Sequence, residues 1–262
     1  MRALEQTLVP PADGWLTDTP AAALSVLAVG WLVAVVALPP PSARVIGLAA
    51  AHGALLGTAL AWTATERSER WAPLQAALLI GTAAACARTF PGGALAYLAV
   101  PVWLAWRRGA WLSRPRAGWG RAIIAGAVFG VVLGLHLLVN ASLTLGYRLR
   151  PPPIAGLIGW IAYDVGANVL ATEAFFRLAL FRRAYRRWPF LGAVALSAGA
   201  SVARYLVDPL LPHSAAILAG ATFYLALLGA GNCVLLVRTG SLVAPLSAAI
   251  VFFGAYRLLT VR

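Results

Sequence analysis

Long apolar runs separated by short polar gaps dominate the sequence. Nine runs are candidate membrane spans: residues 21–39, 45–64, 72–88, 93–107, 121–143, 154–180, 190–207, 214–236 and 241–259. A helix needs about 20 mostly apolar residues to cross a bilayer, and runs of this length recur here. The run at 93–107 is short and contains proline, so eight spans are the alternative to nine. The pattern predicts an all-α fold, a polytopic transmembrane helical bundle.

The composition favours the same class of protein. Hydrophobic residues make up 61% of the 262-residue chain, whereas soluble domains average about 45–50% apolar residues. The formal net charge of +13 would also suit a nucleic-acid-binding protein. We expect no nucleic acid as a partner, because the arginines lie mostly in short gaps between apolar runs. A chain without lysine and rich in alanine, glycine, proline and arginine suggests a GC-rich bacterial genome, so we expect a bacterial inner-membrane protein.

Two clusters of arginine predict which loops face the cytoplasm. They are Arg107, Arg108, Arg114, Arg116 and Arg121 in one gap, and Arg182, Arg183, Arg186 and Arg187 in another. Two spans separate the gaps, so both lie on one side, which is cytoplasmic by the positive-inside rule. Nine spans then place the N-terminus inside, and eight place it outside. Anionic lipid headgroups are the expected partners of both clusters.

One apolar run contains polar residues along much of its length. Asp164, Asn168 and Thr172 follow one another at intervals of four, and Glu173 and Arg177 are also four apart. Residues four apart are neighbours on the surface of a helix. A charge at membrane depth costs roughly 2.5–3.5 kcal/mol on insertion scales. The run therefore predicts either a functional site or a buried ion pair that holds helices together.

No pattern typical of a metal or cofactor site occurs along the chain. The histidines and cysteines are dispersed: His52, His136, His213, Cys86 and Cys233. We expect no metal and no cofactor, and we interpret the cysteines as small buried hydrophobes. His136 and Asn140 are four apart on one predicted helix. We interpret them as a coincidence or a helix-end contact, with recruitment of His136 into a site as the alternative.

Residues 172–177, Thr-Glu-Ala-Phe-Phe-Arg, resemble the first motif of the type II CAAX prenyl endopeptidase family. This family is also called the CPBP or abortive-infection family of intramembrane proteases, and its motif is E-E-x-x-x-R. The run Arg-Thr-Gly-Ser-Leu-Val-Ala-Pro at 238–245 resembles the segment that opens the family's last conserved helix. The resemblance implies a CPBP-like transmembrane core of about four spans at 151–262. About five N-terminal spans at 1–150 would precede it.

Several positions that the resemblance implies for the active site hold other residues. The family's first glutamate, credited with activating water, falls on Thr172, while Glu173 and Arg177 match the second glutamate and the arginine. The positions of two family histidines fall on Tyr205 and Ala249. Glu173 and Arg177 are therefore the candidate catalytic residues that the resemblance leaves.

Peptide hydrolysis by this route needs a carboxylate that takes a proton from water and a donor that stabilises the oxyanion. The Thr172 hydroxyl is too weak a base to replace a glutamate. Glu173 could serve, but a carboxylate paired with an arginine is a weaker base.

Three hypotheses follow. The first is a proteolytically impaired membrane scaffold that binds a membrane protein or peptide. The second is an active intramembrane endopeptidase with Glu173 as general base. The third is a transporter or channel subunit.

The following span offers a charged partner for Asp164. Arg204 and Asp208 lie four apart there, and we expect them, with Asp164 and Asn168, to be structural polar residues. Because unpaired charges in a bundle interior are costly, we predict an interhelical pair between Asp164 and Arg204.

Asp164→Ala and Arg204→Ala are each expected to lower the melting temperature in detergent. If the two side chains pair, the loss in the double variant will be smaller than the sum of the single losses. Thermal unfolding of the four proteins measures the coupling, and fully additive losses would contradict the pair.

Overall fold

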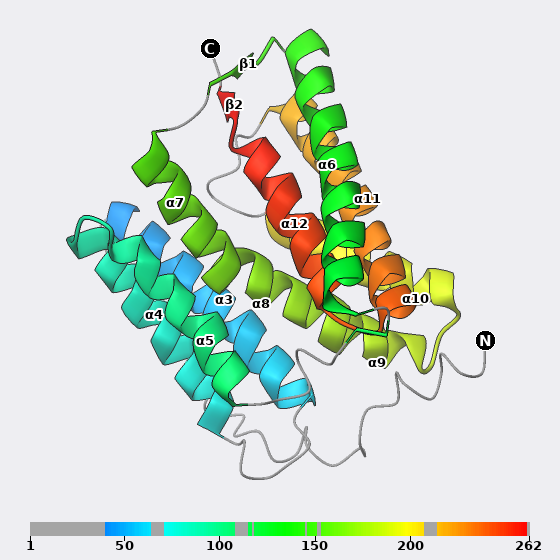
Figure 1. Cartoon of the computed structure of the whole chain (residues 1–262), viewed down its shortest axis with the longest axis horizontal. Coiled ribbons are helices and arrows are strands. Elements are labelled where there is room, and N and C mark those ends of the chain that lie inside the picture. Colours follow the sequence, from blue (N-terminus) through cyan, green and yellow to red (C-terminus); the bar gives the residue numbers. More distant parts are fainter. Residues whose placement is uncertain are drawn as a thin grey trace. The chain divides into compact units, whose positions relative to one another are not determined.

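A computed structural model of the chain describes residues 40–63, 71–107, 115–116, 118–144, 146–150, 153–206 and 214–260. Nearly all of these residues are helical (Figure 1). Within them, three helices are long and apolar enough to cross a membrane: Trp119–Thr144, Ile154–Tyr185 and Ala215–Thr239. Shorter apolar helices lie at Gly93–Trp106, Phe190–Leu206 and Val243–Tyr256. The predicted all-α class is confirmed for the described ranges, and the predicted span at 21–39 lies outside them.

The helices begin and end near the limits of the predicted runs. Their bounds are α3 Pro40–Thr63, α4 Ala72–Thr89, the 3-10 helix η2 Gly93–Leu98, α5 Ala99–Trp106, α6 Trp119–Thr144, α10 Phe190–Leu206, α11 Ala215–Thr239 and α12 Val243–Tyr256. A short antiparallel ladder pairs β1, Arg148–Leu149, with β2, Leu259–Thr260.

Between β1 and α10 runs one continuous helical stretch, Ile154–Tyr185, which we call the long helix. Its parts are α7 Ile154–Tyr163, η4 Asp164–Asn168, α8 Val169–Glu173, η5 Ala174–Phe181 and α9 Arg182–Tyr185. The long helix has 32 residues, which at 1.5 Å per residue gives about 48 Å. A straight crossing of the bilayer core takes about 30 Å, so this helix is longer than one crossing requires, as its run predicts.

The chain folds as two compact units. Unit 1 takes the described residues of Leu112–Leu157 and Leu180–Arg262, and unit 2 takes those of Val9–Trp111 and Ile158–Ala179. The long helix therefore contributes to both units. The predicted boundary between residues 150 and 151 follows the family resemblance rather than compactness, and it stays a prediction.

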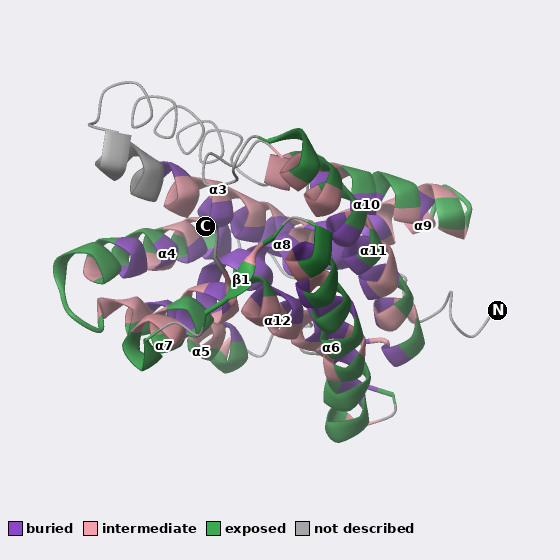
Figure 2. Ribbon diagram, turned by 90° about the horizontal axis from the view of Figure 1, so that it is seen from above, coloured by how far each residue is buried: buried purple, intermediate pink, exposed green. Residues whose placement is uncertain are grey.

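Unit 2 is built from α3, α4, η2, α5 and the middle of the long helix. Small residues let α3 and α4 approach closely: a Cβ added at Gly53 would lie 3.0 Å from the Cα of Ala77. A Cβ added at Gly57 would lie 3.2 Å from the carbonyl oxygen of Pro73. Figure 2 shows α8 buried along its whole length. The polar residues from Asp164 to Arg177 belong to this unit and are buried.

Unit 1 depends on close contact between α6 and α12. Gly126, Gly130 and Gly134 form a stripe at intervals of four that is buried in this contact, where added Cβ atoms would overlap atoms of α12. The hydroxyl of Ser247 on α12 also donates to the carbonyl oxygen of Ile123, at 2.9 Å. Small residues let helix backbones approach in this way in membranes. The stripe is thus a packing surface, as its spacing predicts.

The opposite face of α6 is apolar and exposed. Its exposed apolar side chains are Ile123, Ile124, Val128, Val131, Val132, Leu135, Val139 and Leu143. Such a face would be unfavourable in water and suits contact with lipid chains.

The turn between α11 and α12 contains Thr239, Gly240 and Ser241 of the run at 238–245 that resembles the family. Gly240 ends α11 in the left-handed conformation at a φ of 70°, and its N–H donates to the Leu236 carbonyl at 2.8 Å. The Thr239 hydroxyl lies 2.8 Å from the Leu235 carbonyl. The Ser241 hydroxyl accepts from the N–H of Val243 at 3.3 Å, at the start of α12. Glycine at such a position and hydroxyls beside it are typical of helix ends, so this motif has a structural explanation.

Gly130→Ala is expected to lower the free energy of unfolding by about 1–3 kcal/mol, the usual range for overpacking. The added Cβ would lie 2.5 Å from the Ala248 carbonyl oxygen and 2.9 Å from the Val251 Cβ. Gly254→Ala on α12 is the matched control, because its Cβ meets nothing within 4 Å. Thermal unfolding in detergent compares the two variants, and equal effects would mean that the α6–α12 contact does not require glycine.

Candidate functional site

Five polar residues in the middle of the long helix are buried, and all five belong to unit 2. They are Asp164, Asn168, Thr172, Glu173 and Arg177. The helical turns η4 and η5, on either side of α8, are π-helical. Such turns are rare, and they occur frequently at functional sites. We therefore take this row as the candidate site.

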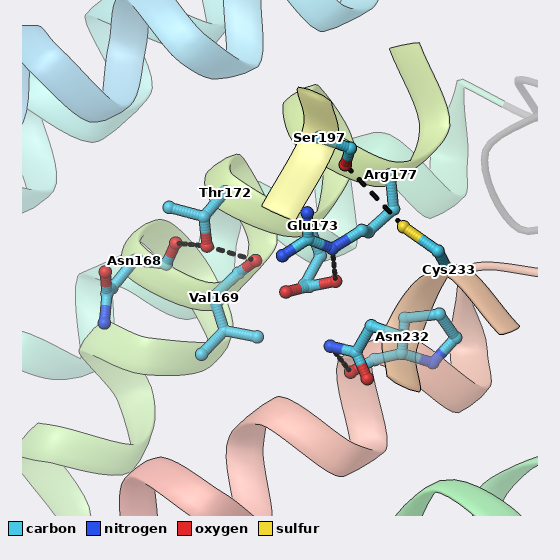
Figure 3. Close-up of polar contacts among 9 residues, drawn as sticks. Asn168, Val169, Thr172, Glu173, Arg177, Ser197, Asn232 and Cys233 are labelled. Atoms are coloured by element: carbon cyan, nitrogen blue, oxygen red, sulfur yellow. Dashed lines mark hydrogen bonds and ion pairs between the residues drawn. The ribbon is translucent and has the colours of Figure 1, made fainter. Parts of the chain in front are cut away.

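Glu173 and Arg177 form the ion pair that their spacing predicts. Arg177 Nε lies 3.4 Å from Glu173 Oε2, and the side chains are 2% and 5% exposed (Figure 3). The guanidinium also lies over the ring of Phe176, 5.9 Å from its centroid. Opposite charges this close stabilise each other where water is excluded.

Thr172 directs its hydroxyl to the backbone of its own helix. Its Oγ1 lies 2.7 Å from the Asn168 carbonyl oxygen and 3.2 Å from that of Val169 (Figure 3). This bonding to the preceding turn is common for threonine in helices. In the family that the sequence resembles, the position of Thr172 holds the first glutamate. Here it holds a hydroxyl bonded to its own helix, so this position has no carboxylate to accept a proton.

A histidine from a distant part of the chain joins the row. His52 on α3 lies with Nε2 3.2 Å from Asn168 Oδ1, and Asn168 Nδ2 donates to Asp164 Oδ1 at 3.0 Å. The other ring nitrogen, Nδ1, lies 2.6 Å from the Leu48 carbonyl oxygen. Sequence reasoning missed His52, and a histidine within an otherwise apolar run was the available signal.

Aromatic rings and one close backbone contact surround this cluster. Tyr163 meets the His52 ring edge-on at 5.7 Å between centroids, and Tyr97 meets Tyr163 edge-on at 5.3 Å. Gly166, in η4, lies so near the Tyr97 carbonyl oxygen that a Cβ there would overlap it. Glycine therefore allows the π-helical turn to approach η2.

The other residues named from the resemblance lie in unit 1. Arg204 lies over the Tyr205 ring at 4.6 Å, and Tyr205 meets Phe253 at 5.5 Å between centroids. Ala249 is fully buried on α12. Asp208 lies outside the described residues. The pair predicted between Asp164 and Arg204 would join residues of different units and stays a prediction.

Unit 1 has polar contacts of its own between helices. The Tyr224 hydroxyl on α11 lies 2.8 Å from His136 Nδ1 and accepts from Asn140 Nδ2 at 3.2 Å. His136 and Asn140 therefore take part in a contact between α6 and α11.

Two further residues of α11 are fully buried. Asn232, which sequence reasoning missed, donates to the Pro245 carbonyl oxygen at 3.3 Å, and Cys233 lies 3.7 Å from the Ser197 hydroxyl (Figure 3). Cys233 fits the predicted burial, whereas Cys86 is only half-buried. Among the described residues, no three His, Cys, Asp or Glu side chains are grouped to hold a metal ion.

Comparison with known proteins adds no evidence on function to this geometry. The chain matches no protein-family model, no curated protein and no solved structure.

Arg177→Met is expected to destabilise the protein by about 3–5 kcal/mol, because it leaves a buried carboxylate without its partner charge. Adding Glu173→Leu should recover much of that loss, since no buried charge then remains. Arg186→Met, at an exposed arginine just after α9, is the control and should be nearly neutral. Chemical unfolding in micelles measures these three variants and Glu173→Leu alone, and losses that simply add would contradict a coupled pair.

Proposed function

We propose that the chain is a multi-pass protein of the bacterial inner membrane with a CPBP-like fold. Its function would be that of a scaffold that binds a membrane protein or peptide, with proteolysis impaired. The observation that supports this most directly is the buried ion pair between Glu173 and Arg177. The acid that proteolysis would need as a base is engaged by a neighbouring guanidinium.

The other positions named from the family motifs support the same interpretation. Thr172 uses its hydroxyl in bonds to backbone carbonyl oxygens. Tyr205 packs against Phe253, and Ala249 is a buried methyl group. General acid–base catalysis needs a group of suitable basicity within reach of the reacting water. The positions that correspond to the family's glutamate and histidines supply none.

The surface properties support insertion in a bilayer. The outer face of α6 is apolar, and eight or nine spans would follow if each predicted run crosses. Arg186, Arg187 and Trp188 are exposed together just after α9. Arginine with tryptophan at a helix end is typical of the membrane interface, where anionic headgroups would meet the basic cluster.

An active endopeptidase is the second candidate, and one observation favours it. The ion-paired acid lies directly before η5, a π-helical segment, and π-helical geometry often marks functional sites. In that case Glu173 would act as general base and Arg177 would orient it.

Cleavage of co-expressed candidate membrane substrates distinguishes the two functions. A scaffold predicts the same substrate pattern for wild type, Glu173→Gln and an empty vector. An active member of the CAAX endopeptidase family, expressed in parallel, shows that the substrates are cleavable. Cleavage present with wild type and lost in Glu173→Gln, at equal membrane abundance, would establish the endopeptidase instead.

A further inference from the structure

The hydrogen bonds that link His52, Asn168 and Asp164 determine how many protons these side chains hold. All three side chains are buried, with exposed fractions of 1%, 6% and 3%. Protons in such a cluster can be counted, because carbonyl and amide oxygens only accept hydrogen bonds and amide nitrogens only donate.

A backbone carbonyl determines that one nitrogen of His52 has a hydrogen. His52 Nδ1 lies 2.6 Å from the Leu48 carbonyl oxygen, which can only accept. Nδ1 therefore has a hydrogen in every state that keeps this bond. The charge of His52 then depends on whether Nε2 also has a hydrogen.

The Asn168 amide can be placed in two orientations, and each needs one further proton. With its oxygen toward His52, Nε2 must donate, so His52 is an imidazolium ion and Asp164 accepts from the amide as a carboxylate. With the amide turned over, its nitrogen donates to a neutral His52, and a protonated Asp164 donates to its oxygen. The count does not depend on which orientation is assigned.

We propose that His52 and Asp164 form a buried proton-binding site that shares one proton through the Asn168 amide. Moving the proton breaks the N–H bond at Nε2, forms an O–H bond at Asp164 and requires the Asn168 amide to turn over. The net charge of the cluster is unchanged. If this proton is lost, two hydrogen-bond acceptors face each other at one end of the Asn168 amide. One buried hydrogen bond is then lost.

Two tyrosines and an ion pair of unit 2 accompany the cluster. The titratable side chain in ring contact with His52 is Tyr163, and Tyr97 stands behind it, both on described elements of unit 2. Glu173 and Arg177 neutralise each other farther along the helix.

The position of the cluster suggests what the proton could do. Asp164 and Asn168 are the first and last residues of η4, on a helix long enough to cross a membrane. Acids and histidines in such helices are the usual parts of proton relays. The inference concerns a proton-binding site and does not rest on the scaffold function.

The test uses the full chain in lipid nanodiscs with ¹⁵N-labelled histidine and ¹³C-labelled aspartate. The chain has three histidines, and His52→Gln assigns the signal of interest. At neutral pH we expect one proton on the pair in wild type, seen as an imidazolium at His52 or as a protonated carboxyl at Asp164. Asp164→Asn should leave a neutral imidazole at His52 and no protonated aspartate signal. His136→Gln, in unit 1, is the control and should change neither signal.

A second variant covers the case in which Asp164→Asn does not fold. Asn168→Leu removes the amide and keeps both titrating groups. In wild type the two signals should change over the same pH range, as expected for coupled groups, and in Asn168→Leu over separate ranges. A neutral imidazole beside an ionised carboxylate in wild type at neutral pH overturns the proposal. So does a titration of His52 that Asp164→Asn and Asn168→Leu leave unchanged.

Discussion

Polar groups in the long helix must find their partners within the protein, because neither lipid nor an apolar interior offers any. Burial of a charge costs several kcal/mol even after relaxation, so Glu173 is close to the guanidinium of Arg177. The same requirement places the Thr172 hydroxyl on carbonyl oxygens and connects Asp164 to Asn168. It also explains why Glu173 and Arg177, the residues of this helix that most suggest catalysis, can be understood first as a buried ion pair.

Features with a local period could be predicted from the sequence. Within the described residues the apolar runs correspond to helices. The four-residue spacing of Glu173 and Arg177 corresponds to their ion pair, and the four-residue spacing of the glycines around Gly130 to the α6–α12 contact. Each depends on residues one turn apart, and helical geometry alone brings these together. The bond between His52 and Asn168 spans 116 positions, so no local pattern indicates it. The π-helical turns are equally hidden, because tertiary contacts such as that of Gly166 with Tyr97 accompany them.

The two motifs that suggest a family differ in what their residues do. Thr239, Gly240 and Ser241 end one helix and begin the next, a function any protein with this turn would need. Glu173 and Arg177, by contrast, place charge where the fold alone would favour apolar side chains. Similarity at the turn therefore bears on architecture, and only the charged pair bears on chemistry.

A π-helical turn accommodates one residue more than an α-helical turn does. The segment Asp164–Asn168 is thus equivalent in geometry to an α-helix with one residue inserted. Excising that residue would rotate everything after it by about 100° relative to everything before it. The direction in which the Glu173 side chain leaves its helix therefore depends on the number of residues in the upstream segment Asp164–Asn168 as much as on their identity.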